Sequence, residues 1–329
     1  MQPPSFLIDY AHVAEPRLGA FLAAKAREFE RVPVDLRDAF SLLRDYLLRG
    51  GKRLRGALVL LGCEAAGGDP DEAIDPSIGL ELLHAYLLIH DDFMDQDDTR
   101  RGGPTLHRAL GGDHLADSIA LLCGSLCEAW AYQLLPGRVQ GAVAAVMEQV
   151  ILGQMADLRA PRAAPLSAEA ILDVQQRKTG SYTFELPLTV GAMLAGADDK
   201  LLRKLSAYAG PLGVAFQIAD DLLGSFGAPE VTGKPSGNDL REGKRTLLVA
   251  RALEMATPAD AEKLRQKLGQ PDADVEALRD ILRRSGAVDA ARAEADQLCR
   301  RALQAVDSLP AGVRDRLAEI ARYTVVRAT

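Results

Sequence analysis

Apolar residues recur every three or four positions along almost the whole chain. The spacing is clear in residues 36–50, LRDAFSLLRDYLLRG, and in the long apolar stretch of residues 115–157. It predicts helices that each bury one face. Breaks between helices are expected near residues 32–33 and 136–137, because proline and glycine interrupt helices there. No segment shows β-strand alternation and turn signals of comparable strength. The pattern therefore predicts an all-α protein.

One apolar helix, expected to begin near Pro76, ends in a cluster of acids. Residues 81–107 read ELLHAYLLIHDDFMDQDDTRRGGPTLH, with Asp91 and Asp95 one helical turn apart and Asp92 beside them. Three carboxylates are thus expected to converge. This suits Mg²⁺, which takes one or two carboxylates together with waters and substrate phosphates. The alternative is a solvated surface turn, because carboxylates oppose the helix dipole at a C-terminus.

A second acidic group follows later in the chain. In residues 210–227, GPLGVAFQIADDLLGSFG, Gln217 is three and four residues from Asp220 and Asp221, at the end of another apolar helix. Charge-dense loops are usually just solvated, but two acidic clusters that are each followed by cations favour a binding site over chance. The glycine-rich loop after this helix adds Lys234, Asp239, Lys244 and Arg245.

Basic residues follow a pair of glycines in residues 50–55, GGKRLR. The glycines are expected to end one helix, and Lys52, Arg53 and Arg55 to enter the first turn of the next. Cations oppose the helix dipole at that end, so a bound anion such as a phosphate would compensate them. A solvated basic turn is the alternative, and the residues themselves leave it open.

Some polar residues carry less information when taken singly. His84 lies two helical turns before Asp91 and is by itself more typical of a core histidine than of a ligand. Asp157 is interpreted as a helix-terminal acid, with a functional role as the alternative. Pro187 predicts a kink in the helix that follows Lys178.

Composition limits the class of protein. The chain has 329 residues, of which 48% are hydrophobic, and no Gly/Ser-rich or Pro-rich linker divides it. We therefore expect a single domain over residues 1–329. The 39 basic residues against 46 acidic ones give a net charge of −7, which argues against nucleic acid as a partner.

Cysteine usage and the chain start point to a reducing compartment. The first ten residues, MQPPSFLIDY, lack the features of a signal peptide, and no run of about eighteen apolar residues predicts a membrane span. We expect a cytoplasmic protein. The cysteines lack the spacing of a disulfide framework and are predicted to be buried free thiols: Cys63, Cys123, Cys127 and Cys299.

Taken together, residues 45–250 resemble the trans-isoprenyl diphosphate synthases, the polyprenyl synthetase family that includes farnesyl and geranylgeranyl diphosphate synthases. The resemblance is carried by an ordered set of motifs: GGKRLR, HAYLLIHDDFMDQDDTRRGGPTLH, KTG, FQIADD and GKPSGNDLREGKRT. It implies one helical bundle around a central cavity and a homodimer. It also implies a Mg²⁺-assisted ionisation of an allylic diphosphate, attack by isopentenyl diphosphate and loss of a proton.

The resemblance also implies residue roles. Asp91 and Asp95 would bind two Mg²⁺ ions and Asp220 a third, with Asp92 and Asp221 in support. The allylic diphosphate would be held by Arg100, Lys178, Lys234 and Lys244. Thr179, Tyr182, Gln217 and Asp239 would line the reacting centre, with Thr179 and Gln217 close to the allylic diphosphate. Isopentenyl diphosphate would be held by Lys52, Arg55, His84 and Arg101.

Two departures from the family pattern stand out. Gly224 takes the place of the last acid of the second motif, which reads DDLLG, so one outer carboxylate is missing. We expect activity to survive with weaker metal affinity. Gly56 takes the place of a proline after GGKRLR, which should affect the geometry of the helix start more than the charge.

Product length is expected to depend on the helix below the first acidic motif. Tyr86, Leu87 and Leu83 are the candidates there, and the pattern resembles synthases that make geranylgeranyl diphosphate. Tyr86 is poorly aimed at the acid face on an ideal helix, so packing in the core or a dimer interface is an alternative role. Farnesyl diphosphate is the alternative product.

Two further functions are alternatives to the synthase. A terpene cyclase would carry an (N/D)DxxSxxxE motif, which is missing, and would have no use for GGKRLR. A non-catalytic subunit of a synthase would tend to lose acidic motifs, whereas this chain keeps the first one intact.

Overall fold

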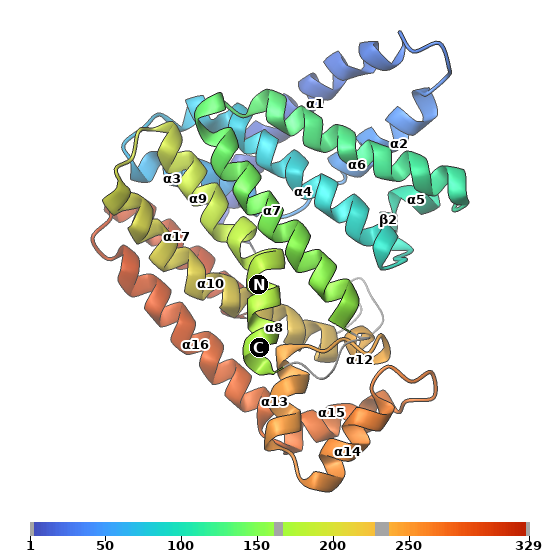
Figure 1. Ribbon diagram of the computed structural model, residues 1–329. Coiled ribbons are helices and arrows are strands. Elements are labelled where there is room, and N and C mark those ends of the chain that lie inside the picture. The colour runs from blue at the N-terminus through green and yellow to red at the C-terminus, as the bar shows by residue number, and fades with distance from the viewer. Residues whose placement is uncertain (1–2, 161–166, 228–236, 327–329) are drawn as a thin grey trace. The chain divides into compact units, whose positions relative to one another are not determined.

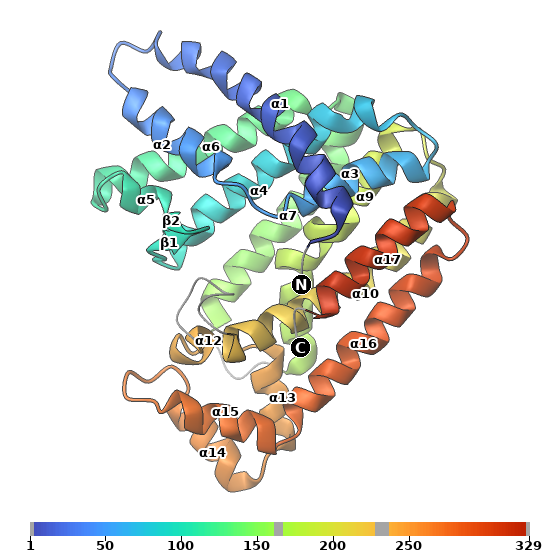
Figure 2. The same cartoon turned by 180° about the vertical axis from the view of Figure 1, so that it is seen from behind.

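The computed structural model describes residues 3–160, 167–227 and 237–326 (Figures 1 and 2). The chain forms two compact units. We call Pro3–Gly141 with Val190–Ala197 the N-terminal unit, and Ala142–Thr189 with Asp198–Thr329 the C-terminal unit.

The N-terminal unit is built on helices, with one short hairpin. Its elements are α1 (Ser5–Phe29), α2 (Arg37–Leu48), α3 (Leu54–Ala65), the 3₁₀ turn η1 (Pro70–Ala73), α4 (Ile74–Met94), β1 (Thr99–Arg100), β2 (Gly103–Pro104), α5 (Leu106–Ala109) and α6 (His114–Leu134). The two strands pair antiparallel, with Thr99 opposite Pro104.

The boundary between the units falls within α7 (Gly137–Arg159) and α9 (Leu186–Leu194). The other elements of the C-terminal unit are α8 (Ala168–Gln175), the π-helix η3 (Gln176–Glu185), α10 (Asp199–Phe226), α12 (Asn238–Arg241), α13 (Leu247–Met255), α14 (Pro258–Lys267), α15 (Val275–Arg284), α16 (Ala287–Val306) and α17 (Ala311–Val326).

Helix α4, which carries the first acidic cluster, is the centre of the N-terminal unit. It runs beside α6 in both views (Figures 1 and 2) and also packs on α3. Small residues permit the close approach of α4 and α6. A Cβ on Gly124 of α6 would lie 2.6 Å from the His90 ring, and one on Gly79 of α4 would lie 3.2 Å from the Ala131 carbonyl.

Helix α10, which carries the second acidic cluster, is the centre of the C-terminal unit. It packs along α16 and against η3. Tyr208 in its middle is fully buried and donates its hydroxyl to the Leu317 carbonyl at 2.7 Å, which ties α10 to α17. Near the middle of η3, Gly180 lies 3.0 Å from the position of a Cβ on Gly213 of α10.

The predicted all-α class is confirmed, with β1 and β2 as the strands of the described chain. The predicted breaks are also confirmed, between Phe29 and Arg37 and between Leu134 and Gly137. Helix α4 begins at Ile74, two residues before the start expected at Pro76. The predicted kink at Pro187 takes another form, since the wide turns of η3 end at Glu185, just before the proline.

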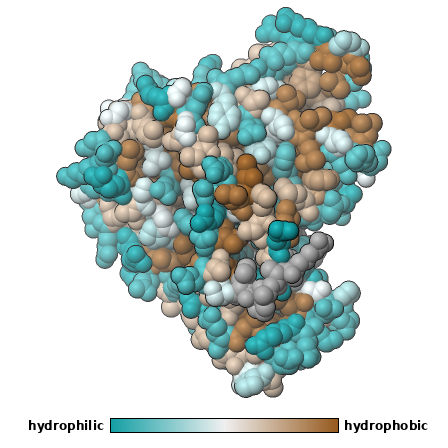
Figure 3. Space-filling model, in the orientation of Figure 1, coloured by the Kyte–Doolittle hydropathy of each residue, from teal (hydrophilic) through white to brown (hydrophobic). Residues whose placement is uncertain are grey.

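The cysteines and the surface complete the description of the fold. All four cysteines are free and buried, as predicted. Brown apolar residues also reach the surface among the teal polar ones in Figure 3. Within the described ranges, none of the helices combines the length and apolar character that crossing a membrane requires.

Candidate active site

The first acidic cluster lies where α4 ends. Helix α4 runs to Met94, and the Asp95 N–H donates to the Asp91 carbonyl at 2.8 Å. Asp91 and Asp95 are both partly exposed. Their carboxylates can therefore meet a ligand while their backbone stays in the last helical turn.

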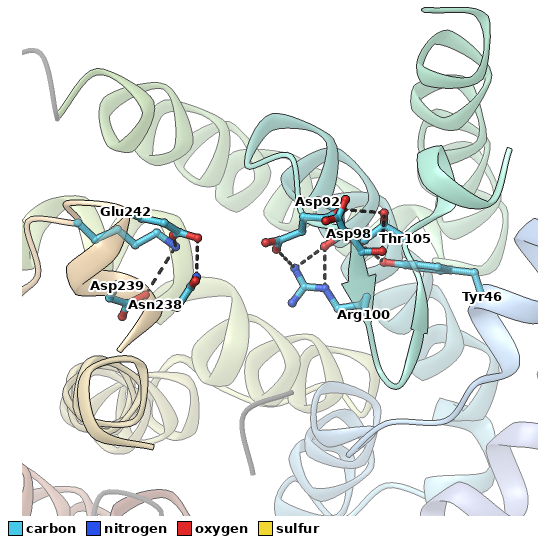
Figure 4. A network of polar contacts seen from close by, with 10 residues as sticks. Tyr46, Asp92, Asp98, Arg100, Thr105, Asn238, Asp239 and Glu242 are labelled. Carbon is cyan, nitrogen blue, oxygen red and sulfur yellow. Dashed lines mark hydrogen bonds and ion pairs between the residues drawn. The ribbon is translucent and has the colours of Figure 1, made fainter. Parts of the chain in front are cut away.

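Asp92 has a different environment, because its side chain is only 1% exposed. Its Oδ2 accepts from the Tyr46 hydroxyl at 2.9 Å, and its Oδ1 from Arg100 Nε at 2.6 Å (Figure 4). Burial raises the pKa of Asp92, and the charge of Arg100 opposes that shift. Both oxygens of Asp92 are thus taken up by partners within the protein, and its convergence with Asp91 and Asp95 stays a prediction. Across the described residues, no three acidic, histidine or cysteine side chains are grouped so as to hold a metal ion.

Arg100 lies in the β1–β2 hairpin and is held from two sides. Its guanidinium pairs with Asp92 and lies 3.2 Å from Asp97, while the Thr105 hydroxyl donates to the Asp97 carbonyl at 2.8 Å. Burial lowers the pKa of Arg100, but Asp92, together with Tyr46 and Asp97, raises it, and the net shift is upward. Arg100 is thus a fixed positive charge.

Arg101 of the hairpin lies close to the arginines of the GGKRLR stretch, Arg53 and Arg55, and we call this group of basic residues the basic corner. Arg101 Nη1 donates to the Gly50 carbonyl at 2.8 Å. Gly51 has φ +140°, and a Cβ on it would lie 3.0 Å from Arg101 Cζ. A side chain at position 51 would therefore be strained by the backbone conformation and would crowd the guanidinium of Arg101.

His84 lies within the electrostatic reach of this corner. Burial lowers the pKa of His84, and the charges of Arg55, Arg101, Arg100 and Arg53 lower it further. Burial and the charge of Arg53 also lower the pKa of Arg101. A neutral imidazole among crowded guanidiniums is an environment that favours an anion.

Arg53 has an acidic partner inside the protein. It adopts a left-handed conformation with φ 47°, donates to the Leu47 carbonyl at 2.8 Å and lies 3.6 Å from buried Glu81. Because α3 begins one residue later, Lys52 precedes the helix and is exposed. The expectation that three cations enter the first turn is therefore wrong, since Arg55 alone of the three lies in it.

Gly56 is explained by its surroundings. Its N–H donates to Glu81 Oε1 at 2.9 Å, and a Cβ on it would lie 1.8 Å from the Tyr10 hydroxyl oxygen. That hydroxyl also makes a 2.8 Å hydrogen bond with Ser77. A proline at this position would lose the hydrogen bond to Glu81 and overlap Tyr10.

In the second acidic motif, Asp221 is buried and Asp220 is partly exposed. Asp221 accepts hydrogen bonds from Gln175 Nε2 at 3.1 Å, Gln217 Nε2 at 3.2 Å and the Leu247 N–H at 3.1 Å. Burial raises its pKa to about 7. Both motifs thus contain one buried acid, Asp92 or Asp221, next to a partly exposed acid, Asp91 or Asp220.

The missing acid at Gly224 has a spatial counterpart. A Cβ on Gly224 would lie 1.8 Å from Asp239 Oδ2, so the Asp239 carboxylate occupies the volume that a side chain at 224 would need. Lys244 Nζ lies 3.8 Å from Asp239 and 2.9 Å from Glu242, which is bonded to Asn238 (Figure 4).

Lys178 has a partner that sequence reasoning missed. Its Nζ donates to Asp157 Oδ2 at 2.7 Å, so Asp157 is more than a helix-terminal acid. Gly153 of α7 permits this pairing, because a Cβ there would lie 2.5 Å from the backbone nitrogen of Lys178. An isolated glycine in an apolar helical stretch is a signal for such a close approach.

The remaining candidates are divided between the units. Thr179 and Tyr182 lie on η3 and are partly exposed, whereas Lys234 lies outside the described residues. Asp91 and Asp95 belong to the N-terminal unit and Asp220 to the C-terminal unit. A joint site and a central cavity therefore stay predictions, as does the single domain.

The product-length candidates lie on α4. The Tyr86 ring lies edge-on to His90, with centroids 4.6 Å apart, and His90 Nε2 is 3.1 Å from the Leu121 carbonyl of α6. Burial raises the pKa of Tyr86, and Glu128 of α6 adds to the shift. Tyr86 therefore lies on the α6 side of α4. Leu83 is buried and Leu87 is partly exposed.

The donor set fits magnesium. Asp91, Asp95 and Asp220 are hard oxygen donors that are partly exposed, and the described residues contain no preformed cage of three side chains. Mg²⁺ requires only one or two carboxylates when a substrate supplies phosphate oxygens. These acids suit such an ion better than zinc, which takes closed sets of nitrogen and sulfur ligands.

Comparison with known proteins now defines the class. The polyprenyl synthetase family model matches residues 38–284. A short-chain isoprenyl diphosphate synthase of Methanothermobacter thermautotrophicus is 34% identical over 84% of this chain and 87% of its own length. A geranylgeranyl diphosphate synthase of Sulfolobus acidocaldarius is 35% identical over 70% of this chain and 71% of its own.

A solved structure agrees with this class. The geranylgeranyl pyrophosphate synthase of Corynebacterium glutamicum, crystallised with isoprenyl diphosphate and magnesium, aligns with a TM-score of 0.89 and 33% identity over 97% of this chain and 98% of that one. The chain belongs to the polyprenyl synthetase family. The predicted enzyme class, trans-prenyltransferase, is confirmed, and the complex with magnesium is consistent with use of a divalent metal.

Proposed function

We propose that this protein condenses an allylic diphosphate with isopentenyl diphosphate and makes geranylgeranyl diphosphate. The carbon–oxygen bond of the allylic substrate breaks, and diphosphate leaves with the electron pair. The double bond of isopentenyl diphosphate attacks the allylic cation, and loss of a proton restores a double bond. The observation that carries the proposal is the division of burial within each acidic motif: Asp92 and Asp221 are buried and hydrogen-bonded, while the side chains of Asp91 and Asp220 are partly exposed.

We propose three Mg²⁺ ions, two with Asp91 and Asp95 and one with Asp220. When bound, they supply Lewis-acid activation of the diphosphate leaving group and a template for it. The side chains of the protein bind and orient the substrates. Arg100 offers a guanidinium that is already fixed in the hairpin, and Lys178 an ammonium held by Asp157. Lys244, Thr179 and Gln217 complete the proposed allylic side.

The second substrate is assigned to the basic corner. Arg101, Arg55 and His84 interact electrostatically within one unit, and Lys52 is exposed beside them. The dense positive charge suits the diphosphate of isopentenyl diphosphate. It gives the GGKRLR motif a use that a terpene cyclase, with a single substrate, would lack.

The proposed product is supported by relatives that make geranylgeranyl diphosphate. Farnesyl diphosphate is the alternative, and a terpene cyclase or a non-catalytic subunit is less favoured. We propose that Tyr86, Leu83 and Leu87 influence the length at which growth stops. Chromatography of the products of Tyr86→Ala tests this role, and an unchanged product would remove Tyr86 from it.

We also propose a homodimer. Leu115 and Leu122 of α6 are 67% and 65% exposed, and residues seven apart lie on one face of a helix. Leu122→Glu should shift the sedimenting species from dimer to monomer, whereas a wild-type monomer would contradict the proposal. The buried free thiols support a reducing location, for which we propose the cytoplasm.

The function is tested with purified protein, Mg²⁺, isopentenyl diphosphate and each allylic diphosphate in turn. We expect a C20 diphosphate from farnesyl diphosphate. Asp91→Ala and Asp220→Ala should abolish turnover, while Asp289→Ala, which removes an exposed acid from the first turn of α16, should not. Absence of any elongated product from the wild type would refute the synthase function. Cyclic hydrocarbon from one substrate would indicate a cyclase.

A further inference from the structure

Helix α2 was given no role by the sequence, yet it contacts the first acidic motif. Its Tyr46 is 2% exposed, and the hydroxyl is directed at Asp92 Oδ2, 2.9 Å away. The other oxygen of Asp92 accepts from Arg100 Nε at 2.6 Å. Figure 4 shows the three side chains as one continuous chain of polar contacts.

The hydroxyl of Tyr46 matters because Asp92 is buried. A carboxylate away from water needs partners for both oxygens, since each lost hydrogen bond leaves a desolvated charge. Arg100 satisfies Oδ1 of Asp92 and leaves Oδ2 to the Tyr46 hydroxyl. If the Tyr46 hydroxyl were removed, the carboxylate would be free to rotate toward the remaining donor, and the guanidinium would move with it.

The rest of the hairpin is held independently. Arg49, one helical turn after Tyr46, bonds to the Pro104 carbonyl of β2, and its guanidinium fills the place of a side chain on Gly103, 2.8 Å from the position of a Cβ there. Loss of the Tyr46 hydroxyl should therefore disturb Arg100 without releasing the hairpin.

We propose that Tyr46 is a positioning residue for allylic diphosphate binding. It fixes Asp92, which in turn fixes the guanidinium of Arg100 in the orientation that meets the diphosphate. This inference rests on the role of Arg100 in the proposed function. Tyr46 itself touches neither the substrate nor the metal.

A purely structural role for the hydroxyl is the competing explanation, and a matched variant separates the two. Tyr208 is also a buried tyrosine with one hydroxyl hydrogen bond, to the Leu317 carbonyl. Tyr208→Phe removes the same group from the middle of α10, where the hydroxyl bonds to α17 and not to a proposed substrate ligand. It should lower the melting temperature and leave both Michaelis constants unchanged.

Tyr46→Phe should raise the KM for farnesyl diphosphate about tenfold, the effect of losing about 1.4 kcal/mol of binding. The KM for isopentenyl diphosphate should change less than twofold. Titration calorimetry of farnesyl diphosphate with Mg²⁺, without the second substrate, should give the same tenfold loss. The proposal is overturned if Tyr46→Phe leaves farnesyl diphosphate binding unchanged, or if both Michaelis constants rise equally.

A double-variant cycle with Arg100→Gln provides a second test. Once Arg100 is absent, Tyr46→Phe should cause no further loss of farnesyl diphosphate binding, because the two residues act in series. Additive losses would overturn the proposal. Wild-type product formation, measured in the same assay, separates these outcomes from a failure of the proposed function.

Discussion

Restoring an acid at position 224 should harm this protein, although the family motif has one there. The Asp239 carboxylate oxygen lies 1.8 Å from the position of a Cβ on Gly224, and an ordinary contact begins at 3.4 Å. In Gly224→Asp, that carboxylate must recede by about 1.6 Å. It would thereby leave its position near Lys244, 3.8 Å away.

Two effects set the size of the loss. Overpacking a filled site costs roughly 1–3 kcal/mol. Two carboxylates about 4 Å apart repel by up to about 4 kcal/mol at an effective dielectric constant of 20, and partial exposure reduces this. We expect the free energy of unfolding to fall by about 2–4 kcal/mol. The affinity for Mg²⁺ in the presence of diphosphate should fall as well.

Urea unfolding and calorimetry with Mg²⁺ and diphosphate measure the two effects. Gly224→Ala is the uncharged control. In an ordinary helix interior, this change would stabilise the protein by up to about 1 kcal/mol, whereas overlap with Asp239 should make it destabilising. The exchange variant Gly224→Asp with Asp239→Gly should recover most of the loss. A stabilising Gly224→Ala, or an exchange variant no better than Gly224→Asp, would refute the reasoning.

Three further predictions concern other positions. The pKa of His84 is lowered in the fold. Below the ordinary histidine pKa of about 6.5, the unfolded chain therefore binds more protons than the folded protein, and stability should fall as pH drops from 7 to 5. Urea unfolding of His84→Asn should show a weaker dependence of stability on pH. Gly56→Pro, which restores the family residue, removes the N–H that donates to Glu81 and should lower the melting temperature in calorimetry by several degrees or more. Gly153→Ala should displace the backbone of Lys178, and kinetics should show a higher KM for the allylic substrate. An unchanged KM for the allylic substrate would show that Gly153 has no influence on its binding.

The sequence predicted the helices well because their ends carry local signals. Proline and glycine mark the gap before α2 and the break between α6 and α7, and Thr257 with Pro258 marks the start of α14. These signals act within a few residues, so no tertiary contact is needed to read them.

Contacts between distant segments could not be predicted in the same way. Spacing on a helix places Asp92 beside Asp91, but it does not say which side faces the interior. The pairing of Arg101 with Gly50 joins positions 51 residues apart and depends on a glycine conformation that periodicity does not reveal. The contact of the Asp239 side chain with Gly224 could not be predicted for the same reason.

The wide turns of η3 should make this segment sensitive to the insertion or deletion of a residue. A π-helix is commonly an α-helix with one extra residue, retained because function uses the displaced side chains. Lys178, Thr179 and Tyr182 all lie within residues 176–185 of η3. Deleting one residue there would let the backbone return to ordinary α-helical bonding, yet it would rotate these side chains out of register. From the roles proposed for these residues, we expect the shortened and more regular helix to bind the allylic diphosphate more weakly.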